Sequence, residues 1–566
     1  MKKQQWLCAL MATVILLGSL VGCQRTPEET ESETEWEFCW PMTPQNGLTF
    51  PTVSASTSEY TLTDADIEEF YRRLDVCDEL IAANRKEDVE ALEEALYYAH
   101  EAYAVIDQQS DIAYLLYCQD YYSDDAWDTY YESYLTRRKG HSDFWSVIHR
   151  AKRKNDAFET VADRFSNVAF PGILMSRSSA VEKNENLLVE IEAELQSLGD
   201  NKTKEQVYDL LNRYLVAAKK VADGCGYQNY YDYVAKTEYF RDFGDEERQV
   251  FREYVKTYIV PLGLEYKEQL DQLEKRMSWV STSLSNAYNE RRYDRLAVDY
   301  LAAYIESLPM SARNAMESAF RLDRIVLGES GVSRERAFVR FTGNTPLCYF
   351  NVDDMDLATV SHELGHYYAD VAGNRETVDP DVRDIPCGFD IKETHSQTNT
   401  LLMVRYMDEL EDGKGYEHFR LRTIYEMLYS IVRETMKDEF DDLLFSDPQA
   451  HTYTADQLTQ KMSELVEAYR IDEFSPSSAR TLSHYWQWCL EDCAYNLCYA
   501  VSAVVALQIY AISLEDYSAA TEYFCRITED IDKERSFVNT VSDAGLGSVF
   551  EADTYLSLIA ELGNEE

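Results

Sequence analysis

Apolar residues recur at helical spacing along most of the chain after about residue 63. One example is the set Leu92, Leu96 and Ala99, which stand four and three positions apart with acidic residues between them. Such spacing places side chains on a single face of an amphipathic helix. We therefore expect a mainly α-helical protein whose helices continue to about Leu327. The first three predicted helices cover residues 64–84, 87–108 and 110–135.

The hydrophobic pattern changes near residue 337. Two short β-type runs, 337–341 and 347–351, flank the sequence Gly-Asn-Thr-Pro at 343–346. Such a turn between two short runs predicts a small β-hairpin. An exposed strand edge there would be able to pair with an extended peptide backbone. A local turn without any such role explains the same residues.

Two further helices are predicted after the hairpin. The first covers about 355–371, where Leu357, Val360, Leu364 and Tyr367 form an apolar stripe. The chain then breaks at Gly-Asn and turns through two prolines and a glycine before a helix that begins near Asp390.

The first of these two helices carries His362 and His366, one helical turn apart, with Glu363 beside them. Two imidazoles on one helix face with an adjacent carboxylate form the HExxH pattern, which suits a zinc ion and a general base for its water. Glu363 is the expected base. Catalytic zinc usually has three protein ligands, and the fourth position holds water.

Glu393 is the candidate third ligand. It lies 27 residues after His366, which is enough chain for one helix to end and the next to return antiparallel. A solvated carboxylate on a helix surface is the alternative. Asp390, three residues earlier on the same helix face, is expected either to accept a hydrogen bond from a zinc-binding histidine or to cap the helix.

The N-terminus has the features of a bacterial lipoprotein signal. Lys2-Lys3 precedes an uncharged apolar stretch over 6–20, and Leu-Val-Gly then leads to Cys23. We expect a signal peptide over 1–22, cleavage before Cys23 and lipidation of that residue. An ordinary secretory signal or an uncleaved anchor are the alternatives. Residues 23–59, polar and acidic at their start, suit a flexible tether, and we expect no later segment to span a bilayer.

The composition limits the partners of the protein. The formal net charge is −48, and loss of Lys2 and Lys3 with the signal would make it −50. Such a surface repels nucleic acid and anionic lipid headgroups. The cysteines include no CxxC pair, which argues against a structural zinc site. Glycine and proline number only 21 and 12 among 566 residues, as expected for long helices with short connections.

Several segments resemble the thimet oligopeptidase/oligoendopeptidase F family of zinc metallopeptidases. The resemblance covers about residues 200–540, and the region before it more weakly. It is carried by four segments of the sequence: ADGCGYQNYYDY at 222–233, SHELGHYY at 361–368, DIKETHS at 390–396 and ALQIYA at 506–511.

The resemblance implies two helical lobes around a deep channel, with the small hairpin beside the zinc helix. It implies one Zn²⁺ held by His362, His366 and Glu393, and hydrolysis of short oligopeptides with Glu363 as the base. A helical region over 60–199 would precede a catalytic domain over 200–566, with a soft boundary at 199–201.

One part of the sequence departs from the family pattern. Tyr495 and Tyr499 match two tyrosine positions whose hydroxyls would face the substrate carbonyl, although packing between helices also explains them. Trp488 stands where the family has a histidine, and His484 lies one turn earlier. His484 and His395 are candidates for binding substrate, with a structural role as the alternative. The departure leaves a second function open, that of a catalytically weak or inactive peptide-binding lipoprotein.

Overall fold

The computed structural model describes thirteen stretches of the chain. The signal, Cys23 and the tether lie outside them, as do most of the residues between the two helices that carry the HExxH motif and Glu393. The described residues are 60–120, 123–154, 158–162, 179–198, 202–278, 301–328, 337–342, 345–351, 357–373, 388–410, 414–491, 493–529 and 536–563.

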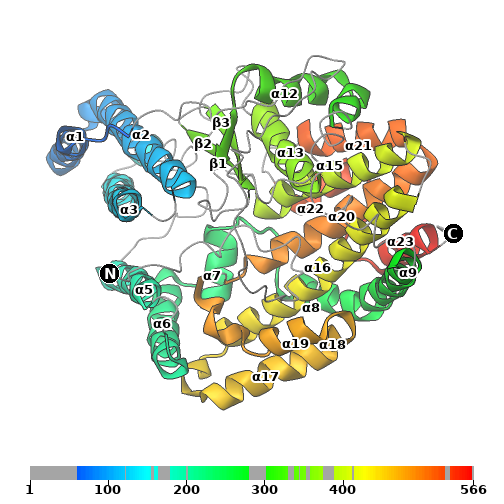
Figure 1. Cartoon of the computed structure of the whole chain (residues 1–566). Helices are drawn as coiled ribbons and strands as arrows, with labels where there is room; N and C mark the ends of the chain where they lie inside the picture. The colour runs from blue at the N-terminus through cyan, green and yellow to red at the C-terminus, as the bar shows by residue number, and fades with distance from the viewer. Residues whose placement is uncertain are drawn as a thin grey trace, which may run out of the picture.

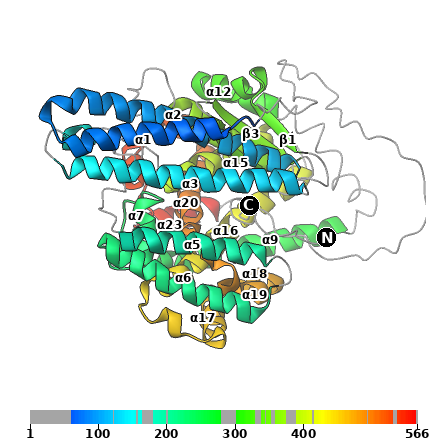
Figure 2. The same cartoon turned by 90° about the vertical axis from the view of Figure 1, so that its left-hand side faces the viewer.

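Three long helices begin the described chain: α1 (Asp64–Ala83), α2 (Val89–Gln119) and α3 (Asp124–Lys152). They lie side by side around a shared apolar core (Figure 2). The side chain of Thr63 accepts a hydrogen bond from the Asp66 backbone and caps α1, as the capping-box pattern predicts.

The predicted break at residues 108–110 is wrong, because α2 runs straight through it. The polar residues there are buried and have tertiary partners. The side chain of Gln109 accepts a hydrogen bond of 2.7 Å from the Thr61 backbone, and Asp111 pairs with Arg340 at 2.7 Å. These long-range contacts allow the helix to continue where the local sequence favours an end.

A three-stranded sheet with the order β1-β3-β2 lies beside these helices. Strands β2 (Ala337–Thr342) and β3 (Thr345–Asn351) are antiparallel, which confirms the predicted hairpin. Strand β1 (Ile325–Gly328) pairs in parallel with β3 and was predicted as helix. Its four residues form a short buried run, and periodicity alone does not distinguish such a run from a helix.

The lower part of the molecule in Figure 1 is helical. It shares one large apolar core with the centre of the molecule. A π-helical segment (Val255–Ile259) connects two of its helices. The helices are α5 (Ser179–Ser197), α6 (Lys204–Cys225), α7 (Tyr230–Thr237), α8 (Asp245–Tyr254), α9 (Val260–Ser278), α16 (Lys414–Ser446), α17 (Ala455–Ala468), α18 (Ile471–Phe474) and α19 (Pro476–Leu482).

Three helices form the centre of the molecule: α13 (Leu357–Gly373), α15 (Phe389–Leu410) and α20 (Asn496–Glu515). Helix α15 packs against both α13 and α20 (Figure 1). Helix α13 also packs on β2 and β3. The remaining helices flank this centre: α12 (Met310–Arg321), α21 (Tyr517–Glu529), α22 (Phe537–Asp543) and α23 (Ala552–Leu562).

Helix α20 corrects one expectation from the sequence. Among the described residues it is the one helix that is long and apolar enough to cross a membrane by length and composition, and none was expected after the signal. Its most apolar stretch is 83% buried inside the protein. The helix is apolar on all sides because the core surrounds it.

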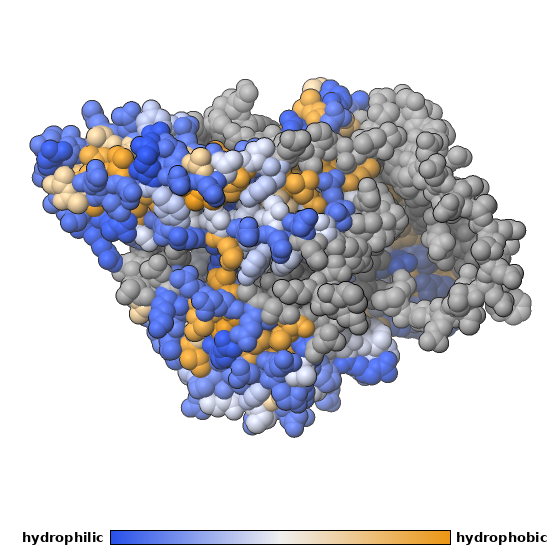
Figure 3. Space-filling model, turned by 60° about the vertical axis from the view of Figure 1, so that its left-hand side comes forward, coloured by the Kyte–Doolittle hydropathy of each residue, from blue (hydrophilic) through white to orange (hydrophobic). Residues whose placement is uncertain are grey.

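The expected fold class is confirmed: the protein is mainly α-helical, with a small sheet beside the helix that carries the HExxH motif. The surface in Figure 3 is largely hydrophilic and is recessed between the α1–α3 group and the helices below it. The division into domains at residue 199 stays a prediction.

Candidate metal centre

His362 and His366 lie on α13 and project from the same face. Their ring centroids are 5.0 Å apart and the rings are almost perpendicular, at 85°. The four residues of the predicted apolar stripe are all buried and hold α13 in the core. The spacing of four residues brings the rings together, while the apolar side of the helix fixes their direction.

Gly365 allows α15 to approach α13 closely. A Cβ atom at this position would lie 2.7 Å from the Cα of Ser396 and 2.8 Å from the carbonyl oxygen of His395. Glycine inside a helix costs about 1 kcal/mol relative to alanine. Here the missing side chain brings the backbones of the two helices together and brings Glu393 within reach of the histidines.

Glu393 completes the group from α15. Its Oε2 atom is 3.6 Å from Nε2 of His362 and 3.7 Å from Nε2 of His366. One ligand atom from each of the three residues lies within 4.8 Å of the others. The three candidate ligands predicted from the sequence therefore converge in space.

This donor set fits a zinc ion. Tetrahedral zinc with ligand bonds of about 2.0–2.1 Å has ligand atoms roughly 3.3–3.4 Å apart. The two distances from Glu393 to the imidazoles are close to that separation. Two imidazoles and one carboxylate also form a known ligand set for catalytic zinc.

The electrostatics of the group favour a cation. Burial raises the pKa of Glu393 to about 8, although hydrogen bonds from Ser396 and Tyr499 act in the opposite direction. Burial, followed by the neighbouring His362, holds the pKa of His366 well below its usual range. A buried carboxyl group and a buried imidazole whose charged form is disfavoured match the needs of a divalent ion.

A buried hydrogen-bond chain fixes α15 against α13. The side-chain amide of Asn399 donates to the Ser361 carbonyl at 2.5 Å. The hydroxyl of Tyr304 in turn donates to the side-chain oxygen of Asn399 at 2.5 Å. The sequence analysis did not predict these residues. The one available signal was Asn399, a polar residue at a core-facing position of α15.

Glu363 lies on α13 beside the ligands and is 6% exposed. Burial and the nearby Glu363 carboxylate together raise the pKa of Cys348 on β3 well above its usual range. The predicted base is therefore buried on α13, adjacent in sequence to His362, and its charge acts on Cys348 of β3.

Tyr499 lies at the same centre. The hydroxyls of Tyr495 and Tyr499 are 2.8 Å apart, and Tyr499 donates a hydrogen bond to Glu393. Burial, and after it the charge of Glu393, raise the pKa of Tyr499 well above its usual range. The Tyr499 hydroxyl therefore remains a protonated donor, as the predicted role requires.

The two candidate substrate-binding histidines are not members of the ligand group. His395 is fully buried, and it is two residues, or about 200° of helix rotation, from Glu393. Burial lowers the pKa of His395 to about 3, and the backbone of Ile527 on α21 opposes part of that shift. His484 is exposed, with Nδ1 3.3 Å from the Arg480 carbonyl, just before a 3₁₀ turn that packs on α17 and α6. Substrate binding by either histidine stays a prediction.

Asp390 has neither of the two predicted roles. It lies inside α15 and its carboxylate pairs with Arg241, with Oδ1 3.2 Å from Nη2. Both side chains are fully buried. The sequence did not indicate Arg241, because the two residues are 149 positions apart.

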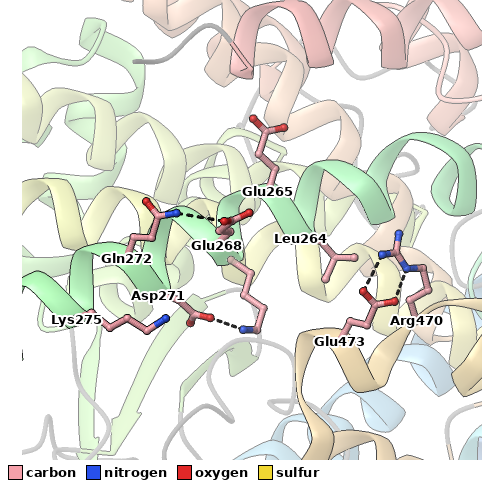
Figure 4. A pocket seen from close by; sticks show the side chains of 9 residues that line it. Leu264, Glu265, Glu268, Asp271, Gln272, Lys275, Arg470 and Glu473 are labelled. Atoms are coloured by element: carbon pink, nitrogen blue, oxygen red, sulfur yellow. Dashed lines mark hydrogen bonds and ion pairs between the residues drawn. The ribbon is translucent and has the colours of Figure 1, made fainter.

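A separate surface pocket of about 500 Å³ lies along α9 and the start of α18 (Figure 4). Two ion pairs form among its charged side chains. Lys267 pairs with Asp271 at 2.6 Å, and Arg470 pairs with Glu473 at 2.6 Å. None of the candidate metal ligands lines it, so we assign it no role.

Comparison with known proteins gives matches in structure alone. No family model and no curated protein matches the sequence. The fold is similar to that of PZ peptidase A with inhibitor 2, at a TM-score of 0.58 and 15% identity, over 89% of this chain and 97% of that one. It is also similar to a protein assigned as an oligoendopeptidase F, at a TM-score of 0.60 and 15% identity, over 89% and 96% of the two chains.

A third similar structure is the oligoendopeptidase F of Enterococcus faecium, at a TM-score of 0.52 and 12% identity, over 88% of this chain and 97% of that one. These matches extend over nearly the full length of each neighbour. The chain therefore has the helical fold seen in oligoendopeptidase F and PZ peptidase structures.

Proposed function

We propose that the protein is a zinc-dependent endopeptidase that hydrolyses short oligopeptides. The observation that carries the proposal is the convergence of His362, His366 and Glu393, with Glu363 buried beside them. The fold supports it, since the similar structures include an inhibitor-bound PZ peptidase and an oligoendopeptidase F.

A small number of residues would carry out the proposed reaction. A zinc ion at the three ligands would lower the pKa of a bound water and polarise the scissile carbonyl. Glu363 takes a proton from the attacking water and delivers it to the leaving amine nitrogen. Tyr499 or Tyr495 donates a hydrogen bond to the carbonyl oxygen as it becomes the oxyanion.

Replacement of Glu363 with Gln tests the base. The shape of the side chain is kept and the ligands are untouched, so zinc content should equal that of the wild type. Turnover of a quenched fluorescent peptide should fall by at least about 100-fold, the usual contribution of general-base catalysis. A turnover within a few-fold of the wild type would show that Glu363 is not the base.

The same assay separates the enzyme from the peptide-binding alternative. Zinc together with turnover by the wild type supports the enzyme. Zinc or peptide binding without any turnover supports the catalytically inactive binder, for which the exposed position of His484 is the motivating observation.

We also propose that the protein is anchored outside the cytoplasmic membrane of a bacterium by a lipid on Cys23. The motivating observation is the basic, apolar and small-residue sequence that ends at this cysteine. Intact mass measurement of the mature protein should show a chain that begins at Cys23 and carries acyl groups. A Cys23→Ala variant should lose the lipid mass and leave the membrane fraction.

A further inference from the structure

The segment Tyr239–Phe240–Arg241 lies between α7 and α8 in the sequence. It contacts the starts of two central helices, α15 and α20. We call it the 239–241 clamp. The backbone N–H of Phe389, at the start of α15, donates to the Tyr239 carbonyl at 3.3 Å. The ring of Tyr239 also packs against that of Tyr495 at the start of α20, with ring centroids 5.4 Å apart and the rings tilted by 42°. The clamp therefore contacts both α15, which carries Glu393, and the start of α20, which carries Tyr499.

Arg241 makes the strongest of these contacts. Its guanidinium binds both carboxylate oxygens of Asp390 on α15, at 3.2 and 3.3 Å. It also donates to the Ala494 carbonyl just before α20, at 2.9 Å. One buried side chain thus ties the first turn of α15 to the start of α20.

The backbone at both ends of this link is strained. Phe240 has φ 52° and Ala494 has φ 63°, which is the left-handed region that residues other than glycine rarely adopt. Such conformations cost about 1–3 kcal/mol each and persist where the surroundings impose them. The strain at Phe240 directs Arg241 inward, and the strain at Ala494 presents its carbonyl to Arg241.

The linked positions are one helical turn from the candidate centre. Asp390 precedes Glu393 by three residues on α15, and Tyr495 precedes Tyr499 by four. The hydroxyl of Tyr499 donates to Glu393. A shift of the start of α15 therefore moves Glu393 relative to Tyr499 on α20 and to His362 and His366 on α13.

We propose that Arg241 is a positioning residue that sets Glu393 and Tyr499 in register with the histidines of α13. The proposal rests on the proposed zinc function, but its readout is zinc affinity rather than turnover. Groups that orient metal ligands usually change metal affinity about 10- to 100-fold when they are removed.

A purely structural role is the competing explanation, because removal of one partner from a buried ion pair is strongly destabilising. The double variant Arg241→Met with Asp390→Leu separates the two. Replacement of a buried ion pair by apolar residues of similar size is often neutral for stability. The variant removes the links to Asp390 and Ala494 without leaving a buried charge.

Arg252 provides the matched control. It is a buried arginine on α8 that binds Asp438 at 2.6 Å and Asp442 at 2.8 Å, both on α16. The control variant Arg252→Met with Asp438→Leu and Asp442→Leu removes a buried arginine together with both of its carboxylate partners. It leaves the contacts of Arg241 with Asp390 and Ala494 in place. The conservative variant Arg241→Lys provides a partial rescue, because lysine keeps the charge but loses the two-pronged contact.

The experiment measures the dissociation constant for Zn²⁺ by chelator competition on the full chain, with thermal unfolding of each variant. We expect the Arg241/Asp390 double variant to bind zinc about 10- to 100-fold more weakly at a wild-type melting temperature. The lysine variant should fall between it and the wild type, and the control should bind zinc as the wild type does.

Wild-type zinc affinity in the folded Arg241/Asp390 variant would overturn the proposal. If that variant does not fold, Arg241→Lys, which keeps a positive charge beside Asp390, takes its place with the same expected direction. A wild-type protein that binds zinc without hydrolysing peptides would contradict the proposed function and leave the affinity comparison valid. A wild-type protein that binds no zinc would overturn both.

Discussion

At the scale of single residues, the candidate centre depends on close packing as much as on its ligands. Glu393 reaches the histidines only because Gly365 has no side chain between α13 and α15. Tyr499 meets the same carboxylate from α20. Each of these residues leads to a prediction that separates zinc binding, catalysis and folding.

Replacement of Gly365 with Ala should weaken zinc binding and lower stability. The added Cβ would lie 2.7 Å from the Cα of Ser396, so α15 must move, at a cost of about 1–3 kcal/mol. Gly263→Ala is the matched control, since its Cβ would meet Phe474 at 2.8 Å, far from the ligands. Urea unfolding should show both losses, while zinc titration should show a change only for Gly365→Ala. Equal zinc affinity in the two variants would contradict the packing argument.

Replacement of Tyr499 with Phe should lower kcat by about 100-fold, the usual effect of losing one oxyanion donor. KM and zinc content should change little. Tyr495→Phe, which removes the hydroxyl 2.8 Å away, should have the smaller effect. Steady-state kinetics on one peptide would check this, and a larger loss for Tyr495→Phe would reverse the assignment.

At the scale of elements, α13, α15 and α20 are held by buried polar contacts that a sequence pattern shows poorly. The HExxH motif was predictable because its residues lie within one helical turn. Glu393 was predicted because the segment around it, DIKETHS, resembles the oligoendopeptidase F family. Arg241, Tyr304 and Asn399 were not, because each acts through a partner that is distant in sequence. The same reason explains the missed continuity of α2 at Gln109, where a distant backbone group satisfies the side chain.

The contact between helices α8 and α16 should lose stability in acid. Burial alone would raise the pKa of Asp442, but Arg252 and Arg248 hold it below its ordinary value of about 3.9. The lowered folded pKa contributes stability that is present above about pH 4 and is lost as the pH falls through the folded value.

The variant Asp442→Asn tests this directly. It should be less stable than the wild type at neutral pH, and the gap should narrow as the pH falls below about 4. Free energies of unfolding from urea titrations between about pH 7 and pH 3 provide the comparison. A difference in the free energy of unfolding between wild type and variant that stays constant across that range would show that the charge of the Asp442 carboxylate does not contribute to stability.

At the scale of the whole molecule, the fold follows from the sequence in class but not in detail. Amphipathic spacing and scarce glycine and proline predicted a mainly helical chain, and the structure confirms it. Strand β1 was missed because four apolar residues fit a helix or a strand equally well. The sequence analysis did not predict that α20 is apolar and long enough to cross a membrane. The structure shows that the helix is instead buried in the core of the protein.

Zinc should stabilise the whole fold, because the three ligands come from two helices that the ion would join. A ligand present at 100 times its dissociation constant adds about 2.7 kcal/mol to the free energy of unfolding. The melting temperature of the wild type should therefore rise on zinc addition and fall on chelation. Glu393→Ala should show little of this response, and a full response in that variant would indicate binding elsewhere.

Zinc content per chain, measured on purified wild type and on Glu393→Ala, tests the central claim most directly. The account predicts one tightly held zinc per wild-type chain and a large loss in the variant. A wild-type protein without zinc after exposure to the metal, or equal zinc in both proteins, would contradict it.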